Sequence, residues 1–195
     1  MTSVVPVVCP GCHERVFSKS NDWVILCPCG TMHARIDGIS VIDYEAGEFT
    51  RGGDGERAYL PFWKVAAQYT ITEETVSDTG GRQITGQNGG YGNVKNITFT
   101  FPAYDLPPRG FKDIALKLTR EPHMYELAKL DPSIPRRRCV VKPGDADKMA
   151  DFVLVTLEAE KQGVMMELQY ALTITSKKLV YLPYYEKEGK AIPAY

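Results

Sequence analysis

The sequence has no long run of apolar residues and almost no net charge. Even the apolar stretch from Phe152 to Leu157 is broken by Thr156 and followed by Glu158, and it is far shorter than the ~20 residues that cross a bilayer. We therefore expect no direct membrane insertion. The 23 basic and 24 acidic residues leave a net charge of −1, which argues against a polyanion as the main partner.

Histidine is scarce, and no catalytic motif surrounds it. His13, His33 and His123 are the only histidines, and none stands in the HExxH pattern of a hydrolytic zinc site. The glycine-rich stretch 77–93 lacks the Lys-Ser or Lys-Thr pair of a phosphate-binding P-loop, and we interpret it as a flexible loop. We therefore expect a protein that is not an enzyme.

The N-terminal residues carry no secretory signal. Residues 1–8 have neither a basic start nor a long enough apolar segment, and the first cysteine follows at once. Four of the five cysteines stand in close pairs, a usage that fits a reducing compartment better than a disulfide framework. We expect a cytoplasmic protein.

The paired cysteines carry the strongest signal in the chain. They occur as Cys9-Pro10-Gly11-Cys12 and as Cys27-Pro28-Cys29-Gly30. Each pair forms a turn that directs two thiolates at one point, and two such turns build a closed tetrahedral S4 site. This spacing predicts one Zn(II) per chain. A rubredoxin-like iron site uses the same four thiolates, and replacement of one cysteine by His13 or His33 stays open.

Short strands flank both cysteine pairs. They are expected at Arg15–Phe17, Trp23–Leu26, Met32–Ile36 and Ile39–Ile42, the last two joined by a turn at Asp37-Gly38. This pattern over residues 1–43 resembles the zinc ribbon family of modules, which usually carries two CPxCG knuckles. Here His13 stands where the first knuckle usually has Gly, and the second, CPCG, is one residue short. The resemblance implies a structural metal module and no activity.

The remainder of the chain reads as a linker and a larger domain. Residues 44–55 are acidic and glycine-rich, which is typical of a linker. Residues 56–195 then alternate or repeat at helical spacing. We expect strands around Trp63–Ile71, Ile97–Phe101, Leu168–Ile174 and Leu179–Tyr185, a turn at Thr175–Lys177, helices over Phe111–Leu118 and from Asp145 to before Gly163, and a shorter helix after Pro122.

A weak internal echo runs through the larger domain. Tyr59-Leu60-Pro61-Phe62-Trp63 matches Tyr181-Leu182-Pro183-Tyr184-Tyr185, and Phe101-Pro102-Ala103-Tyr104 matches Ile192-Pro193-Ala194-Tyr195. We interpret the pairs as equivalent strands of a pseudo-repeat, each with a proline at a sheet edge or at the start of a strand. These Tyr-Leu-Pro-aromatic elements resemble a signature of uncharacterised bacterial zinc-ribbon proteins, a likeness that implies no activity.

The whole chain is expected to be an α+β protein. An all-β zinc ribbon precedes a domain with an antiparallel sheet and two or three helices on one face. We expect a non-catalytic adaptor or complex subunit that binds another protein, with a partner surface built by the aromatic residues Tyr59, Phe62, Trp63, Tyr181, Tyr184 and Tyr185. A nucleic-acid-binding zinc-ribbon protein is the alternative and would use the basic residues Arg136, Arg137, Arg138 and Lys142. A rubredoxin-like electron carrier is the second alternative.

Overall fold

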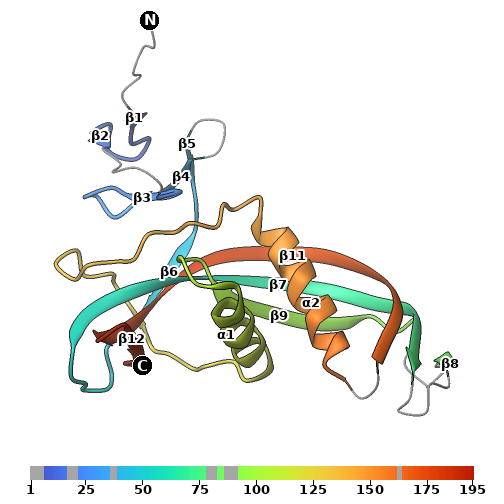
Figure 1. The fold of residues 1–195 in the computed structure, drawn as a ribbon. Coiled ribbons are helices and arrows are strands. Elements are labelled where there is room, and N and C mark those ends of the chain that lie inside the picture. Colours follow the sequence, from blue (N-terminus) through green and yellow to red (C-terminus); the bar gives the residue numbers. More distant parts are fainter. Residues whose placement is uncertain (1–6, 17–21, 36–38, 78–82, 86–91, 162–163) are drawn as a thin grey trace, which may run out of the picture.

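The protein is an α+β molecule with a small N-terminal part and a larger sheet covered by helices (Figure 1). This is the expected fold class. The computed structural model describes residues 7–16, 22–35, 39–77, 83–85, 92–161 and 164–195. The expected flexible loop at 77–93 falls mostly outside these residues.

Two antiparallel sheets make up the N-terminal part. Strand β1 (Val7–Val8) pairs with β2 (Arg15–Val16), and β3 (Val24–Leu26), β4 (Met32–Arg35) and β5 (Ile39–Val41) form a three-stranded sheet in that order. The side chains of β3 alternate between two cores. Ile25 packs with Cys9 and Cys27, whereas Val24 joins the core of the large sheet.

Two very long strands, β7 (Glu56–Ser77) and β11 (Val164–Lys187), form the spine of the large sheet and pair antiparallel along their length. The sheet order is β10 (Leu127–Ala128), β6 (Tyr44–Gly47), β11, β7 and β8 (Gln83–Thr85), while β9 (Lys95–Pro102) also pairs with β7 and β12 (Lys190–Pro193) with β11. These pairings are antiparallel except for β6, which runs parallel to β11. The large sheet is therefore antiparallel, as expected, except for the parallel strand β6.

Helices α1 (Pro108–Arg120) and α2 (Ala146–Ala159) lie on the same side of the sheet (Figure 1). Ala115 and Leu116 of α1 and Val153 and Leu154 of α2 enter the main core. Neither helix is long and apolar enough to cross a bilayer. The prediction of a shorter helix after Pro122 is wrong. This segment is extended and ends in β10, which pairs with β6 at the edge of the large sheet.

The prediction of a linker over residues 44–55 is wrong at its start, because residues 44–47 form strand β6 of the large sheet. Its residues Tyr44, Glu45 and Ala46 pair with Leu179, Val180 and Tyr181 of β11. The chain thus passes from β5 of the small sheet into the large sheet with only Ile42 and Asp43 between. A four-residue strand whose partner lies far along the chain leaves little local pattern, which explains why composition alone pointed to a linker.

The turn expected at Thr175–Lys177 is also wrong, because β11 runs through it without reversing. Ile174 pairs with Ala67 and Ser176 with Ala66, so Thr175 is an extra residue in the ladder, a β-bulge. Tyr170, Leu172 and Ile174 face the main core at even positions, whereas Leu179 and Tyr181 do so at odd ones. One inserted residue is what such a change of parity requires.

The two halves of the expected internal repeat lie against each other in the large sheet. Leu60 of β7 lies opposite Leu182 of β11, so the two Tyr-Leu-Pro-aromatic elements pair with each other about a local two-fold axis. The same two-fold axis relates the second pair of motifs. Phe62 pairs with Pro102 as Tyr184 pairs with Pro193, and Pro61 and Pro183 accept hydrogen bonds from Ala103 and Ala194 at 2.9 and 3.0 Å.

The two-fold relation extends to segments that share no visible sequence motif. Tyr59 bridges Arg136 in parallel, as Tyr181 bridges Ala46. Four residues after each bridge, Val140 and Thr50 donate backbone hydrogen bonds to Ala103 and Ala194, the equivalent alanines. Pro61 and Pro183 lie inside long strands, but their nitrogens point away from the β7–β11 ladder and interrupt none of its hydrogen bonds.

Candidate metal centre

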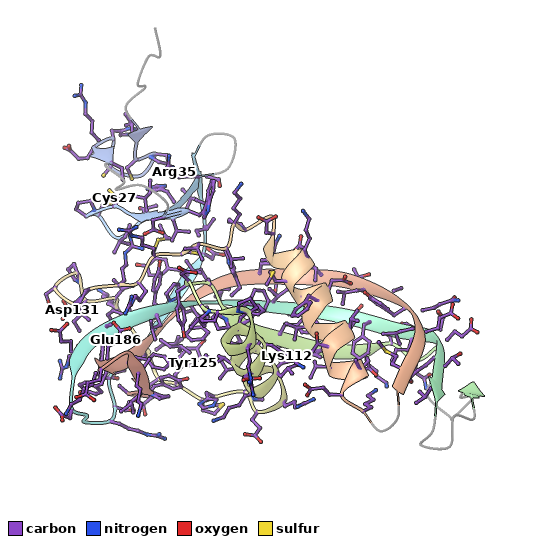
Figure 2. The ribbon with its side chains drawn as sticks, viewed as in Figure 1. Cys27, Arg35, Lys112, Tyr125, Asp131 and Glu186 are labelled. Carbon is purple, nitrogen blue, oxygen red and sulfur yellow. The ribbon has the colours of Figure 1, made fainter. Side chains whose placement is uncertain are left out.

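Two tight turns bring the cysteines of the N-terminal part together. The backbone N–H of His13 donates to the Cys9 carbonyl at 2.8 Å, and that of Gly30 donates to the Cys27 carbonyl at 2.8 Å. Strands β1, β2, β3 and β4 hold the ends of these turns. Figure 2 shows Cys27 in this small part of the molecule, well apart from Lys112 on α1.

The four sulfur atoms of Cys9, Cys12, Cys27 and Cys29 all lie within 4.8 Å of one another. Cys9 Sγ is 3.7 Å from Cys29 Sγ, and Cys12 Sγ is 3.5 Å from Cys27 Sγ. A tetrahedron with metal–sulfur bonds of ~2.3 Å has edges of ~3.8 Å. The cluster is therefore compatible with a metal ion held by four cysteines in a zinc-ribbon-like arrangement.

Hydrogen bonds to sulfur favour thiolates at two of these positions. The Thr31 hydroxyl lies 3.2 Å from Cys29 Sγ and helps to lower the pKa of Cys29 to about 6. Burial opposes ionisation of Cys9, but backbone N–H groups, including that of Gly11 at 3.3 Å, bring the pKa of its thiol below the ordinary value. Sulfur ligands bind metal as thiolates, so these contacts prepare the cluster for a cation.

The shortened second knuckle still delivers both sulfurs. The backbone N–H of Cys29 favours the Cys27 thiolate, yet burial and the neighbouring sulfurs raise the pKa of Cys27 to about 12. A group of four close thiols resists full ionisation without a cation, because each new negative charge repels the others. A divalent ion removes this repulsion.

Neither histidine near the knuckles joins the four sulfurs. His13 is exposed, and among the residues that the structure describes only cysteines make up the cluster. His33 lies on β4, fully buried, and neither ring nitrogen has a hydrogen-bond partner among the described residues. Burial disfavours the charged ring and lowers the pKa of His33.

Asp22 fastens the cysteine-bearing part to the large sheet. Its carboxylate accepts hydrogen bonds from the backbone of Val24 at 3.2 Å and of Cys139 at 3.0 Å, and it lies 3.5 Å from the Arg136 guanidinium. Arg136 in turn donates to the hydroxyl of the buried Tyr181 at 2.8 Å. Burial raises the pKa of Asp22 despite the nearby arginine, so the folded protein bears a desolvation cost at this contact.

A second contact joins the same two parts. The backbone N–H of Trp23 donates to the Cys139 carbonyl at 2.9 Å. The Lys142 ammonium lies 4.1 Å from the centre of the Trp23 ring, a cation–π distance. Cys139 is fully buried, and burial raises the pKa of its thiol to about 12, so it fits a core position.

The basic residues proposed for nucleic-acid binding mostly have partners within the protein. Arg136 binds Asp22 and Tyr181, and Lys142 lies over Trp23. Arg137 makes a forked contact to Glu186 with distances of 2.8, 2.9 and 3.2 Å. Arg138 is exposed and makes no ion pair with another described residue.

The aromatic residues expected to form a partner surface are buried instead, which corrects that expectation. Each has at most 7% of its surface exposed, and the six are Tyr59, Phe62, Trp63, Tyr181, Tyr184 and Tyr185. They occupy both faces of the β7–β11 ladder. Residues of both helices pack on one face, and Leu118 of α1 and Tyr125 before β10 contribute to the other. Packing explains the recurring motif, since two equivalent strands need equivalent core residues.

Several residues of the site went unnoticed in the sequence. Thr31 beside Cys29, Asp22 between the two parts, and Tyr44, whose hydroxyl donates to the Gly30 carbonyl at 3.0 Å, are examples. Only Thr31 had a local signal, because it follows the second knuckle directly. Comparison with protein-family models, with curated proteins and with solved structures finds no match for this chain.

Proposed function

We propose that the protein is a non-catalytic adaptor or complex subunit, built on a zinc-loaded ribbon, that binds another protein. One observation carries the first half of this proposal. Four sulfurs lie at tetrahedral edge distances, with 3.5 and 3.7 Å between two of the pairs, and a metal held by four cysteines has no open position for a substrate. The role of such a site is to stabilise the fold around it.

Zinc is favoured over iron by the packing around the sulfurs. Among the described residues, the aliphatic side chains Val16 and Ile25 pack with the buried cysteines. The nearby Trp23 ring instead contacts Lys142. Rubredoxin-type iron sites usually have aromatic cover over the metal, and the position of Phe17 lies outside the described residues.

A protein partner is favoured over nucleic acid by the state of the basic residues. Arg136, Arg137 and Lys142 already contact Asp22, Glu186 and Trp23. Binding to a phosphate backbone requires several cations that are free to displace counterions. Recruiting Arg136 and Lys142 would cost contacts that hold the two parts of the molecule together. Recruiting Arg137 would break its ion pair with Glu186.

Two measurements on the purified full-length chain test this function. Elemental analysis of protein prepared without added metal is expected to give about one zinc per chain, whereas iron and a red colour would support the electron carrier. Affinity purification from the native host, with nuclease treatment, is expected to retain a stoichiometric protein partner. Recovery of nucleic acid in place of a protein would contradict the adaptor.

A further inference from the structure

A cleft of about 720 Å³ opens beside the internal two-fold axis, outside the cysteine site. Tyr104 from the first copy of the repeat and Tyr184 and Tyr195 from the second line it. Ile114 and Leu118 of α1, which follows the first copy, add an apolar wall. The cleft thus needs both copies and the helix, and its volume is in the range of ligand-binding sites.

Aromatic rings beside the cleft contact one another in a continuous row. Tyr104 meets Phe62 edge-on at 5.7 Å, Phe62 stacks on Tyr184 at 6.0 Å, and Tyr184 meets Tyr195 edge-on at 5.8 Å. The Tyr184 and Tyr195 hydroxyls lie 3.3 Å apart. These contacts hold the half-buried Tyr104 ring in place, so that it meets a ligand at little entropic cost.

The charges that line the cleft favour an acidic ligand. Its three cations are Lys117, Arg137 and Arg138, against the two acids Asp105 and Glu186. Arg137 and Glu186, the second of which is labelled in Figure 2, form an ion pair and neutralise each other. Neither Lys117 nor Arg138 makes an ion pair with another described residue. The cleft therefore has two cations outside ion pairs and one such acid, Asp105.

We propose that this cleft binds a short acidic peptide segment of a partner protein. Its carboxylates contact Lys117 and Arg138, and a neighbouring apolar or aromatic side chain packs on Tyr104 and Ile114, which are half-buried and line the cleft. This inference rests on the proposed adaptor function and specifies the partner. A nucleic-acid strand fits less well, because strand-binding grooves follow the backbone with a row of cations, and the cleft has only two that are not engaged.

The Tyr104 hydroxyl is a further hydrogen-bond donor in the cleft. Burial raises the pKa of Tyr104 to about 12, so the hydroxyl is protonated at neutral pH. A protonated phenol can donate a hydrogen bond to a carboxylate or a backbone carbonyl of the peptide. Tyr104→Phe removes this donor and keeps the ring that contacts Phe62.

A displayed library of random short peptides, selected against the full-length zinc-loaded protein, tests the inference. We expect enriched peptides in which aspartate or glutamate adjoins an aliphatic or aromatic residue. The double variant Lys117→Glu/Arg138→Glu should bind them at least about tenfold more weakly, since two attractive charges are replaced by two that repel the peptide. Peptides without an acidic bias, or no enrichment at all, would overturn the inference.

A matched double variant controls for overall charge. Arg109 and Lys129 are exposed, do not line the cleft and make no ion pair with another described residue. Arg109→Glu/Lys129→Glu should therefore keep full peptide affinity, and an equal loss in both double variants would refute a specific cleft. Thermal unfolding checks that both proteins remain folded.

One outcome separates this inference from the proposed function, and two others decide both together. If Lys117→Glu/Arg138→Glu retains the native partner in affinity purification, the adaptor function stands and the cleft is not its docking site. If the variant instead loses binding to a single-stranded oligonucleotide that the parent protein binds, the cleft serves nucleic acid, and both the inference and the adaptor function fail. Loss of the partner together with loss of the selected peptides supports both.

Discussion

Two residues, His13 and Gly30, have left-handed backbone angles directly after the second cysteine of each knuckle. Their φ angles are 62° and 90°. Glycine adopts such angles without strain, and among other residues histidine is one of the more tolerant. The departure from the usual zinc-ribbon glycine at His13 is therefore a change of residue without a change of backbone geometry.

Gly30→Ala should weaken metal binding through backbone strain alone. No atom lies within 4 Å of the added Cβ, but a left-handed angle costs a residue with a Cβ about 1–2 kcal/mol. Because metal binding and folding are linked in such modules, affinity should fall about fivefold to thirtyfold. Competition with a chromogenic chelator measures it.

Gly52→Ala is the matched control, since Gly52 also has open space and no left-handed angle. It should leave the metal affinity unchanged. Equal effects of the two substitutions would mean that glycine flexibility in general, and not the angle at Gly30, governs the site.

Glu45 contributes pH-dependent stability to strand β6. Although partial burial opposes its charge, hydrogen bonds from Lys178 at 2.7 Å and Tyr125 at 2.8 Å bring the pKa of Glu45 below the ordinary glutamate value. A lowered folded-state pKa means that this stabilisation is complete above the unfolded pKa of about 4.3. It is lost as the pH falls through the folded value.

Glu45→Gln should therefore cost about 1 kcal/mol at neutral pH. Urea unfolding should show the difference from the parent protein shrinking below about pH 4. Glu48→Gln, at an exposed glutamate nearby, should have no comparable effect. A difference for Glu45→Gln that stays constant at all pH values would show that the carboxylate charge is not responsible.

At the scale of the elements, the bulge at Thr175 lets one strand serve two parts of the core. Tyr170, Leu172 and Ile174 on its N-terminal side, and Leu179 and Tyr181 on its C-terminal side, all face the helices. Without the extra residue, one group would turn to the opposite face, because side chains alternate along a strand.

Deletion of Thr175 should therefore destabilise the protein by at least about 3 kcal/mol, since several apolar side chains lose their burial. Thermal unfolding followed by circular dichroism measures the loss. Thr175→Ala keeps the residue count and removes only the hydrogen bond of the hydroxyl to the Ala66 carbonyl at 3.0 Å, so it should cost no more than about 1 kcal/mol. A deletion variant as stable as Thr175→Ala would show that register is not fixed at this position.

At the scale of the whole molecule, the cysteine-bearing part and the large sheet share more than a peptide connection. Val24 and Met32 enter the main core, Asp22 binds the backbone of Cys139, and Trp23 lies against Lys142. We still expect the large sheet to fold without the metal, because its ladder and both helices lie entirely within residues 44–195.

Cys27→Ser should release the metal, unfold residues 7–43 and leave the large sheet folded with a lower unfolding temperature. The decrease follows from lost burial of Val24 and Met32 and from the freed Arg136. Limited proteolysis with mass spectrometry identifies which part is cleaved. Rapid cleavage of residues 44–195 together with the N-terminal part would show one cooperative unit, with no domain boundary near residue 43.

The sequence by itself determined the cysteine set, the fold class, both helices and the internal repeat. Each of these has a short-range signal: the spacing of paired cysteines, a helical or alternating period, or a recurring motif. These signals survive because local backbone geometry decides which side chains can share a face.

Three features depend on the tertiary structure alone: the burial of the aromatic motif, the strand at 44–47, and the path of the chain after Pro122. Tyr181 and Phe62 are core residues because two distant strands pair and carry them into clusters on opposite faces of the sheet. Strand β6 exists because β11 offers it an edge. Exposure and long-range pairing depend on which surfaces meet, and no local window of sequence contains that information. The cleft beside the two-fold axis has the same origin, since it exists only where both copies and α1 come together.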